Sequence, residues 1–152
     1  MPFQNKINYQ QAPAVEGDFC SANPYASYPA GEGQLIAGND GVKIGKFAWI
    51  DAATGEVSNK GTGAPSGFIH REGQAFINDW LAESSMLIPK GYPVTVHIKG
   101  DYWVRPTTAA KAGDKVSATA DGSASVGDGT ETPWTFVSAG AAGELCKISS
   151  WV

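Results

Sequence analysis

The chain has 152 residues, of which 17% are charged and 19 are glycine, and its formal net charge is −4. Typical domains have roughly 25% charged residues and about 7% glycine, so many turns and few solvated helical faces are expected. A small acidic excess argues against nucleic acid and anionic membrane as partners, because both reward clustered lysine and arginine. No apolar run reaches the ~18 residues that span a bilayer, and the first residues lack an export signal.

Residues 1–31 carry little signal for local folding. They hold prolines at positions 2, 13, 24 and 29, five aromatic rings and few charges. Proline fixes its own φ and favours an extended predecessor, which argues against a helix. Disordered tails are usually charged and poor in aromatic residues. We therefore expect an extended N-terminal arm over residues 1–31 that lies on a surface, and a β-domain over residues 32–152.

The body begins with strand signals. Residues 34–38 precede the turn residues Asn39-Asp40-Gly41, which predicts a hairpin with the strand that follows. Residues 42–50 alternate with a slip at Gly45, as in a strand with a β-bulge. That bulge would keep four large apolar side chains on one face: Val42, Ile44, Phe47 and Trp49.

The middle of the chain is less regular. Residues 51–55 predict a turn, and residues 58–67 an exposed loop. Residues 75–82 fit a helix or a strand equally well, and periodicity does not decide between them. Residues 84–88 resemble a strand, followed at 89–91 by a predicted type II turn.

The clearest two-residue period in the chain covers residues 94–99 and continues through residues 102–104. Asp121-Gly122 predicts a tight hairpin between residues 116–120 and 123–126. Residues 134–137 and 145–152 are two further strands. Eight or nine short strands with glycine-rich turns indicate an all-β domain, either a jelly roll or a related β-sandwich.

The glycine-rich segments do not match nucleotide-binding motifs. Residues 41–47 have three residues between the glycines where a phosphate loop has four, and Phe47 stands where a metal-binding hydroxyl is required. Residues 61–67 lack the dinucleotide-binding spacing, and Pro65 would obstruct the helix start that receives the pyrophosphate. We predict no cofactor.

Candidate catalytic and metal-ligating groups are sparse. His70 and His97 lack an evident third ligand, so two separately hydrogen-bonded strand histidines are expected and no metal site. Asp79 and Glu83, with Glu72 nearby, would make a carboxylate pair only if that segment were helical, and a solvated polar edge is favoured. No enzymatic activity is predicted.

Two cysteines and five tryptophans remain. Cys20 and Cys146 are too few for a disulfide scaffold, and we expect both to be reduced, with a bridge from arm to body as the alternative. Most of the tryptophans are expected in the core, although exposed indoles would form a platform for sugar rings.

Several short motifs together resemble the structural cement proteins that decorate the capsids of tailed bacteriophages. In the first fifty residues these are Met1-Pro2-Phe3-Gln4, residues 12–19, residues 21–24 and Gly45-Lys46-Phe47-Ala48-Trp49. In the body they are residues 68–72, residues 83–86, residues 88–91 and Gly100-Asp101-Tyr102-Trp103. The chain departs from the family pattern at Cys20, where a small residue is expected, and at Tyr25, where a basic one is expected.

The resemblance implies a non-enzymatic β-sandwich on the outer capsid surface of the virion, assembled in the host cytoplasm. Its partners would be the major capsid protein and further copies of itself, as a homodimer or homotrimer. The residues expected at these contacts all lie in the arm: Phe3, Gln4, Pro13, Val15, Glu16, Asp18, Phe19, Asn23, Pro24 and Tyr25. A β-sandwich module that binds carbohydrate or a host surface is the second hypothesis, and a small hydrolase the third.

Overall fold

The computed structural model describes residues 14–72 and 86–152, and every helix or strand assigned within these ranges is a β-strand. The predicted all-β class is confirmed. No helix in the described part of the chain is long and apolar enough to cross a membrane. The segment at 75–82, for which helix and strand were both open, lies outside the described residues, as do positions 84 and 85 of the predicted strand at 84–88.

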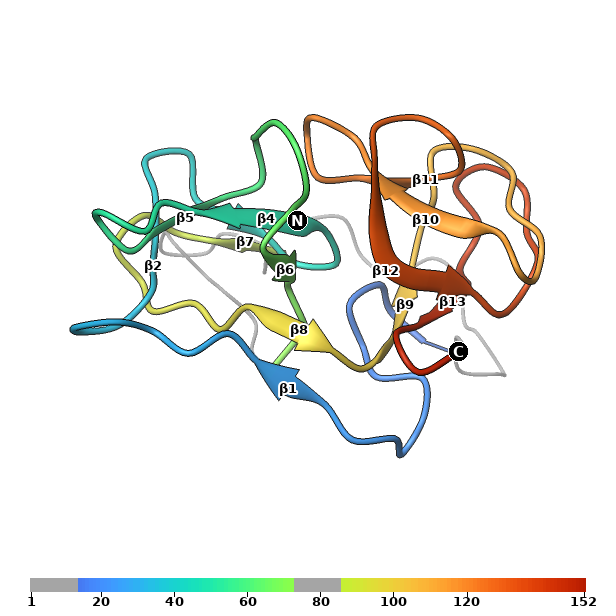
Figure 1. Ribbon diagram of the computed structural model, residues 1–152, viewed down its shortest axis with the longest axis horizontal. Coiled ribbons are helices and arrows are strands. Elements are labelled where there is room, and N and C mark those ends of the chain that lie inside the picture. The colour runs from blue at the N-terminus through green and yellow to red at the C-terminus, as the bar shows by residue number, and fades with distance from the viewer. Residues whose placement is uncertain (1–13, 73–85) are drawn as a thin grey trace, which may run out of the picture.

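The strands form two main sheets and one small one (Figure 1). The six-stranded sheet has the order β1 (Ala26–Ser27), β8 (His97–Lys99), β6 (Gly67–Phe68), β4 (Phe47–Ile50), β5 (Glu56–Ser58) and β2 (Ile36–Ala37). The five-stranded sheet has the order β11 (Ala124–Ser125), β10 (Lys115–Ala118), β12 (Thr130–Phe136), β13 (Cys146–Ser149) and β9 (Asp101–Val104). The small sheet pairs β3 (Val42–Lys43) with β7 (Leu87–Ile88). Several sheets of short strands are consistent with a β-sandwich; the jelly-roll connection stays a prediction.

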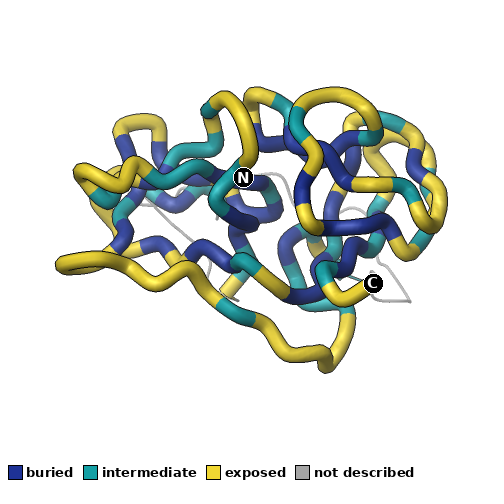
Figure 2. Tube along the Cα trace, viewed as in Figure 1, coloured by how far each residue is buried: buried dark blue, intermediate teal, exposed yellow. Residues whose placement is uncertain are grey.

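Two apolar clusters fill the interior. One lies mainly among β9–β13 and includes Phe47, Tyr102, Trp134 and Phe136, and the other lies mainly within the first half of the chain. Figure 2 shows these buried segments as dark blue stretches along the strands of both halves of the molecule.

The chain passes from one main sheet to the other at Gly100. This residue separates β8 from β9 and has φ of 136°, a conformation that L side chains rarely adopt. A Cβ atom there would lie 2.6 Å from the hydroxyl oxygen of Tyr102. The continuous strand predicted over residues 94–104 is therefore wrong at this point, because its two halves belong to different sheets.

The predicted slip at Gly45 is in the right place, but the chain changes sheet there too. Val42 and Ile44 belong to the apolar cluster in the first half of the chain. Phe47 belongs to the cluster among β9–β13, and Trp49 packs against that cluster. The expectation that these four side chains share one face was wrong. Gly45 has φ of 81° and allows the chain to turn between β3 and β4.

The predicted hairpin across residues 39–41 is also wrong. The turn itself is present, since the Gly41 amide donates to the Gly38 carbonyl at 2.9 Å. However, β2 pairs in parallel with β5, and β3 pairs with β7. A turn motif fixes the local bend but not the sheet that the next strand joins.

Other local predictions agree with the structure. The Asp121-Gly122 hairpin is confirmed, because β10 and β11 pair in antiparallel fashion and the Gly122 amide donates to the Thr119 carbonyl at 2.9 Å. The turn after β7 lies one residue later than predicted, with the Tyr92 amide donating to the Pro89 carbonyl at 3.2 Å. Strand β5 was not predicted, because only its central residue, Val57, is buried and so gives no alternation.

The tip of the hairpin formed by β10 and β11 connects the two main sheets. The Phe47 amide in β4 donates to the Gly122 carbonyl at 2.8 Å, and the Lys46 ammonium donates to the Ser123 hydroxyl at 3.1 Å. Since β4 and the β10–β11 hairpin belong to different sheets, these bonds fix the orientation of one sheet relative to the other.

Candidate functional site

Residues 17–28, here called the clasp, run beside the strands that meet at Gly100. The Gly17 amide donates to the Trp103 carbonyl at 2.7 Å, the Trp103 amide donates to the Asp18 carbonyl at 2.9 Å, and the Cys20 amide donates to the Asp101 carbonyl at 3.1 Å. These bonds place the start of the clasp antiparallel to β9.

The second half of the clasp continues along the other sheet. Strand β1 pairs with β8 in antiparallel fashion, and the Tyr28 amide donates to the Val96 carbonyl at 2.7 Å. Figure 1 shows β1 beside β8, and the blue chain before it reaching toward β9. One segment thus hydrogen-bonds to the edge strand β9 of one main sheet and, through β1, supplies the edge strand of the other, where the chain passes between them.

Asp101 anchors the bend of the clasp through its carboxylate. One oxygen accepts from the Ser21 hydroxyl and from the Asn23 side-chain amide, each at 2.6 Å, and the other accepts from the Ser149 hydroxyl at 2.6 Å. Burial alone would raise the pKa of this carboxyl, but the hydrogen bonds from Ser149, Ser21 and Asn23 outweigh it, and the pKa is lowered. The carboxylate therefore stabilises the clasp in its charged form.

An aromatic cluster lies beneath the clasp, centred on Phe19. Its ring centroid is 3.9 Å from that of His70, 4.9 Å from that of Tyr25 and 5.4 Å from that of Tyr102. The hydroxyl of Tyr102 donates to the Lys99 carbonyl at 3.0 Å. The clasp therefore contributes apolar packing to the body as well as backbone hydrogen bonds.

The two histidines meet in this cluster, with ring centroids 5.3 Å apart in an edge-to-face arrangement. The Nδ1 atom of His70 lies 2.7 Å from the Gly17 carbonyl, and because that oxygen only accepts, this nitrogen carries the proton. His97 is 3% exposed, and neither of its ring nitrogens has a hydrogen-bond partner. The expectation of two separately hydrogen-bonded histidines holds for His70 only.

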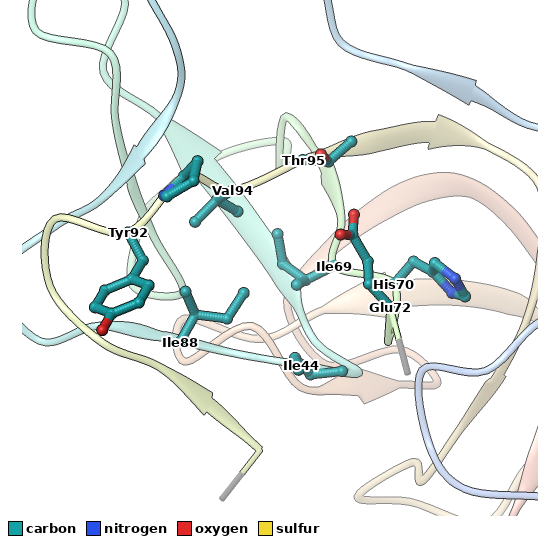
Figure 3. Close-up of a pocket in the computed structure, with 9 residues that line it drawn as sticks. Ile44, Ile69, His70, Glu72, Ile88, Tyr92, Val94 and Thr95 are labelled. Atoms are coloured by element: carbon teal, nitrogen blue, oxygen red, sulfur yellow. The ribbon is translucent and has the colours of Figure 1, made fainter. Parts of the chain in front are cut away.

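A cavity of about 270 Å³ with a mixed polar and apolar lining lies next to this cluster, as Figure 3 shows. Ile44, Ile69, Ile88 and Val94 contribute its apolar lining, and the ring of His70 points away from them. Within the described residues, no three histidine, cysteine or acidic side chains come together to hold a metal ion. We find no arrangement here that assigns a catalytic role.

Comparison with known proteins identifies the family. The model of the family described as XM1 gp53 minor capsid protein matches residues 3–150. The chain belongs to this family. A chain in the solved structure of the capsid of Myoviridae phage XM1 has a TM-score of 0.65 and 18% identity, with 99% of this chain and 98% of that chain covered. At that identity the likeness shows a shared fold. No curated protein matches the chain.

The resemblance to phage capsid-associated proteins is thus confirmed, and this minor capsid protein is a structural component of the virion. Of the contact residues expected from the sequence, Phe3, Gln4 and Pro13 lie outside the described residues. The others divide into those that contact the body and those that face outward.

Several predicted contact residues pack against the protein's own body. Phe19 joins the aromatic cluster, Asn23 bonds to Asp101, and the carboxylate of Asp18 lies 3.2 Å from the guanidinium of Arg71. The Pro24 carbonyl accepts from the indole nitrogen of Trp151 at 2.8 Å. Glu16 packs against Gly45, where a Cβ atom would lie 3.1 Å from the Glu16 Cγ.

Two predicted contact residues face solvent. Val15 is 40% exposed and Tyr25 is 60% exposed, although one face of the Tyr25 ring contacts Phe19. Tyr28, which was not predicted, is 40% exposed on the same segment. Figure 2 shows the outer stretch of the clasp and the loop after it as a mostly exposed run along the lower edge of the view.

The cysteines and tryptophans complete the comparison with the sequence. Cys20 and Cys146 are both free thiols, as expected, and burial, followed by the charge of Asp101, raises the pKa of Cys20 to about 11. Of the tryptophans in the described ranges, only Trp134 is fully buried and only Trp151 is exposed. The prediction that most indoles lie in the core was therefore too strong, and Trp80 lies outside the described residues. A sugar platform of exposed indoles stays a hypothesis.

Proposed function

We propose that this minor capsid protein is a cement protein, which binds the outside of the expanded capsid and stabilises contacts between major capsid protein subunits. The observation that carries the proposal is the family match, which spans residues 3–150 and therefore includes both the arm and the body. A structural role of this kind requires no catalytic group and no cofactor.

The outward side of the N-terminal segment supplies a surface suited to such docking. Val15, Tyr25 and Tyr28 are large apolar or aromatic residues, each at least 40% exposed. Apolar surface of this kind is stabilised when a partner removes it from water, and tyrosine adds a hydroxyl that can bond at the interface rim. The clasp holds Tyr25 and Tyr28 on a fixed body, and Val15 directly precedes it, which reduces the entropy lost on docking.

The partners in this proposal are the major capsid protein and other copies of the same chain. A homodimer or homotrimer would present several such surfaces to the shell at once. Simultaneous contacts raise the effective concentration of each surface, so individually weak interfaces hold the oligomer firmly.

Co-sedimentation with capsids tests the proposal. Wild-type protein is expected to pellet with expanded empty heads and to remain in the supernatant with unexpanded shells. Val15→Ser and Tyr25→Ser should each weaken binding. Val137→Ser is the matched control, because Val137 has a similar exposure of 36% but lies beside the five-stranded sheet. Absence of binding to both head forms would rule out the cement role.

A deletion separates the arm from the clasp. Removing residues 2–13 leaves every clasp contact described above in place, whereas a deletion through residue 24 also removes bonds to Asp101. Loss of capsid binding in the shorter deletion, with unchanged thermal unfolding, would assign docking to residues 2–13. Retained binding would place the contact on the outward side of the clasp.

A further inference from the structure

The clasp covers a histidine whose surroundings do not suit a positive charge. His97 lies in β8 with its ring within 6.5 Å of three aromatic rings, those of Phe19, Tyr25 and Tyr102. Two of these rings, Phe19 and Tyr25, belong to the clasp. Since an imidazolium needs acceptors for two N–H groups and His97 has none, the closed arrangement stabilises the neutral ring.

The ionisable groups around His97 have opposing effects. His70 contacts the ring directly and becomes a second positive charge when it binds a proton. Glu72 and His97 both line a second pocket, and the Glu72 carboxylate there would attract an imidazolium. The charges of Asp18 and Arg71 are paired with each other. Burial raises the pKa of Tyr102, so its phenol stays neutral in acid. Burial, followed by the charge of His70, lowers the pKa of His97 from 6.5 to about 4, so the unfavourable effects dominate.

We propose that His97 and His70 form an acid-sensitive latch, in which protonation releases the clasp, including β1, from β8 and β9 while the other strands of the two sheets remain folded. Release gives His97 access to water, and a hydrated imidazolium finds the acceptors that the closed site lacks. The latch concerns the free protein and does not depend on the cement role.

The clasp is the element that gives way because it is held less firmly than the strands it covers. Its bend at residues 21–25 is exposed, and its main-chain bonds to the body lie before that bend, to β9 and the Arg71 amide, and after it, to β8 and the Val96 carbonyl. β8, by contrast, pairs with β6 as well as with β1, and Val96 just before it is fully buried. Local opening at the lowest-stability segment is the general behaviour of folded proteins.

The sign of the effect follows from the pKa of His97. The pKa is lower in the closed state, so the stabilisation is fully present above pH 6.5 and is lost as the pH falls toward 4. With these two values, the equilibrium constant for opening rises about 30-fold between pH 7.5 and pH 5.

Amide hydrogen exchange of the full chain without capsid tests the latch. The reporters are the amides of Gly17, Cys20 and Tyr28, all of which donate to the body, and the reference amides are those of Phe136 and Val137 in the other sheet. After correction for the intrinsic pH dependence of exchange, the reporters should lose protection between pH 7.5 and pH 5 while the references keep theirs. Unchanged reporters, or equal loss at reporters and references, would overturn the proposal.

Two variants assign the effect to the histidines. His97→Phe fills the same space without a titratable group, and its clasp should stay protected down to pH 5. His70→Gln keeps a donor for the Gly17 carbonyl but removes the second charge, and should move the opening to lower pH. If His97→Phe does not fold, His97→Asn serves instead. Opening in both His97 variants at the same pH as in wild type would contradict the latch.

Discussion

Phe19 and Tyr102 form an antiparallel bridge, and their rings lie stacked with centroids 5.4 Å apart. Phe19 comes from the segment predicted as an arm, and Tyr102 is a fully buried residue of β9. The described part of that segment is therefore a component of the body, held by backbone bonds to both sheets. The surface on which we expected the arm to lie is therefore, in part, the surface of the protein's own β-domain.

Truncating the ring at the centre of the clasp should destabilise the whole protein. Phe19→Ala removes contacts to His70, Tyr25 and Tyr102, and we expect the free energy of unfolding to fall by about 2–4 kcal/mol. Tyr25→Ala is the matched control, because its ring is largely exposed and its loss should cost less than about 1 kcal/mol. Urea unfolding measures both; equal effects would mean that the cluster is not part of the cooperative core.

The charge on Asp101 should make a pH-dependent contribution to stability. Asp101→Asn keeps the shape of the side chain but removes the negative charge of the carboxylate that accepts hydrogen bonds from Ser21, Asn23 and Ser149. The free energy of unfolding at pH 7 should therefore fall by about 2–3 kcal/mol. The pKa of the folded carboxyl lies below 3.8, so this contribution is present above pH 3.8 and is lost as the pH falls through the folded value.

Denaturant titrations of the wild type and Asp101→Asn over a pH series check this sign. The difference in unfolding free energy between the two proteins should be constant near neutral pH and shrink in acid. A difference that stays the same at every pH would show that the carboxylate charge does not stabilise the clasp.

The ion pair at the start of the clasp should matter much less. Arg71 and Asp18 lie 3.2 Å apart, but about a third of each side chain is exposed, and water screens such pairs. Arg71→Met should therefore lower the unfolding free energy by about 0.5 kcal/mol, an effect that 0.5 M salt largely removes from the wild type as well. A loss above about 2 kcal/mol, measured by thermal unfolding, would show that the pair is more important than its exposure indicates.

Local sequence rules predicted the strands of this protein better than their partners. The Asp121-Gly122 turn places two adjacent strands in one hairpin, so residue chemistry alone was sufficient. The chain changes sheet at Gly45 and Gly100. The alternation slips at Gly45 and continues across Gly100, and in neither place does it indicate a change of sheet. A two-residue period in the sequence indicates which face of a strand is buried, but it does not indicate against which sheet that face packs.

The candidate site shows the same limit. The aromatic and proline content of residues 1–31 predicted a segment that lies on a surface, and within the described residues the clasp does lie along β8 and β9. However, no local signal linked Phe19 to Tyr102 or Asn23 to Asp101. His97 alternates with the apolar residues Val96 and Ile98 in the sequence, yet it is buried, because the clasp residues Phe19 and Tyr25 pack against its ring. Such contacts join chain segments about seventy or eighty residues apart, and the alternation of apolar and polar residues within one strand does not predict them.

The contact between the hairpin tip and β4 should be sensitive to a single added methyl group. Gly122 has φ of 83°, and a Cβ atom there would overlap the Phe47 carbonyl oxygen and lie 2.9 Å from the Asn59 carbonyl oxygen. Gly127 has a similar φ of 77° but no atom within 4 Å of the added Cβ. Both alanine variants bear the backbone strain of about 1–3 kcal/mol, and only Gly122→Ala also bears the clash. We therefore expect Gly122→Ala to lower the unfolding free energy by about 1–3 kcal/mol more than Gly127→Ala, measured by urea unfolding. Equal losses would mean that the hairpin tip can move away from β4 without weakening the connection between the sheets.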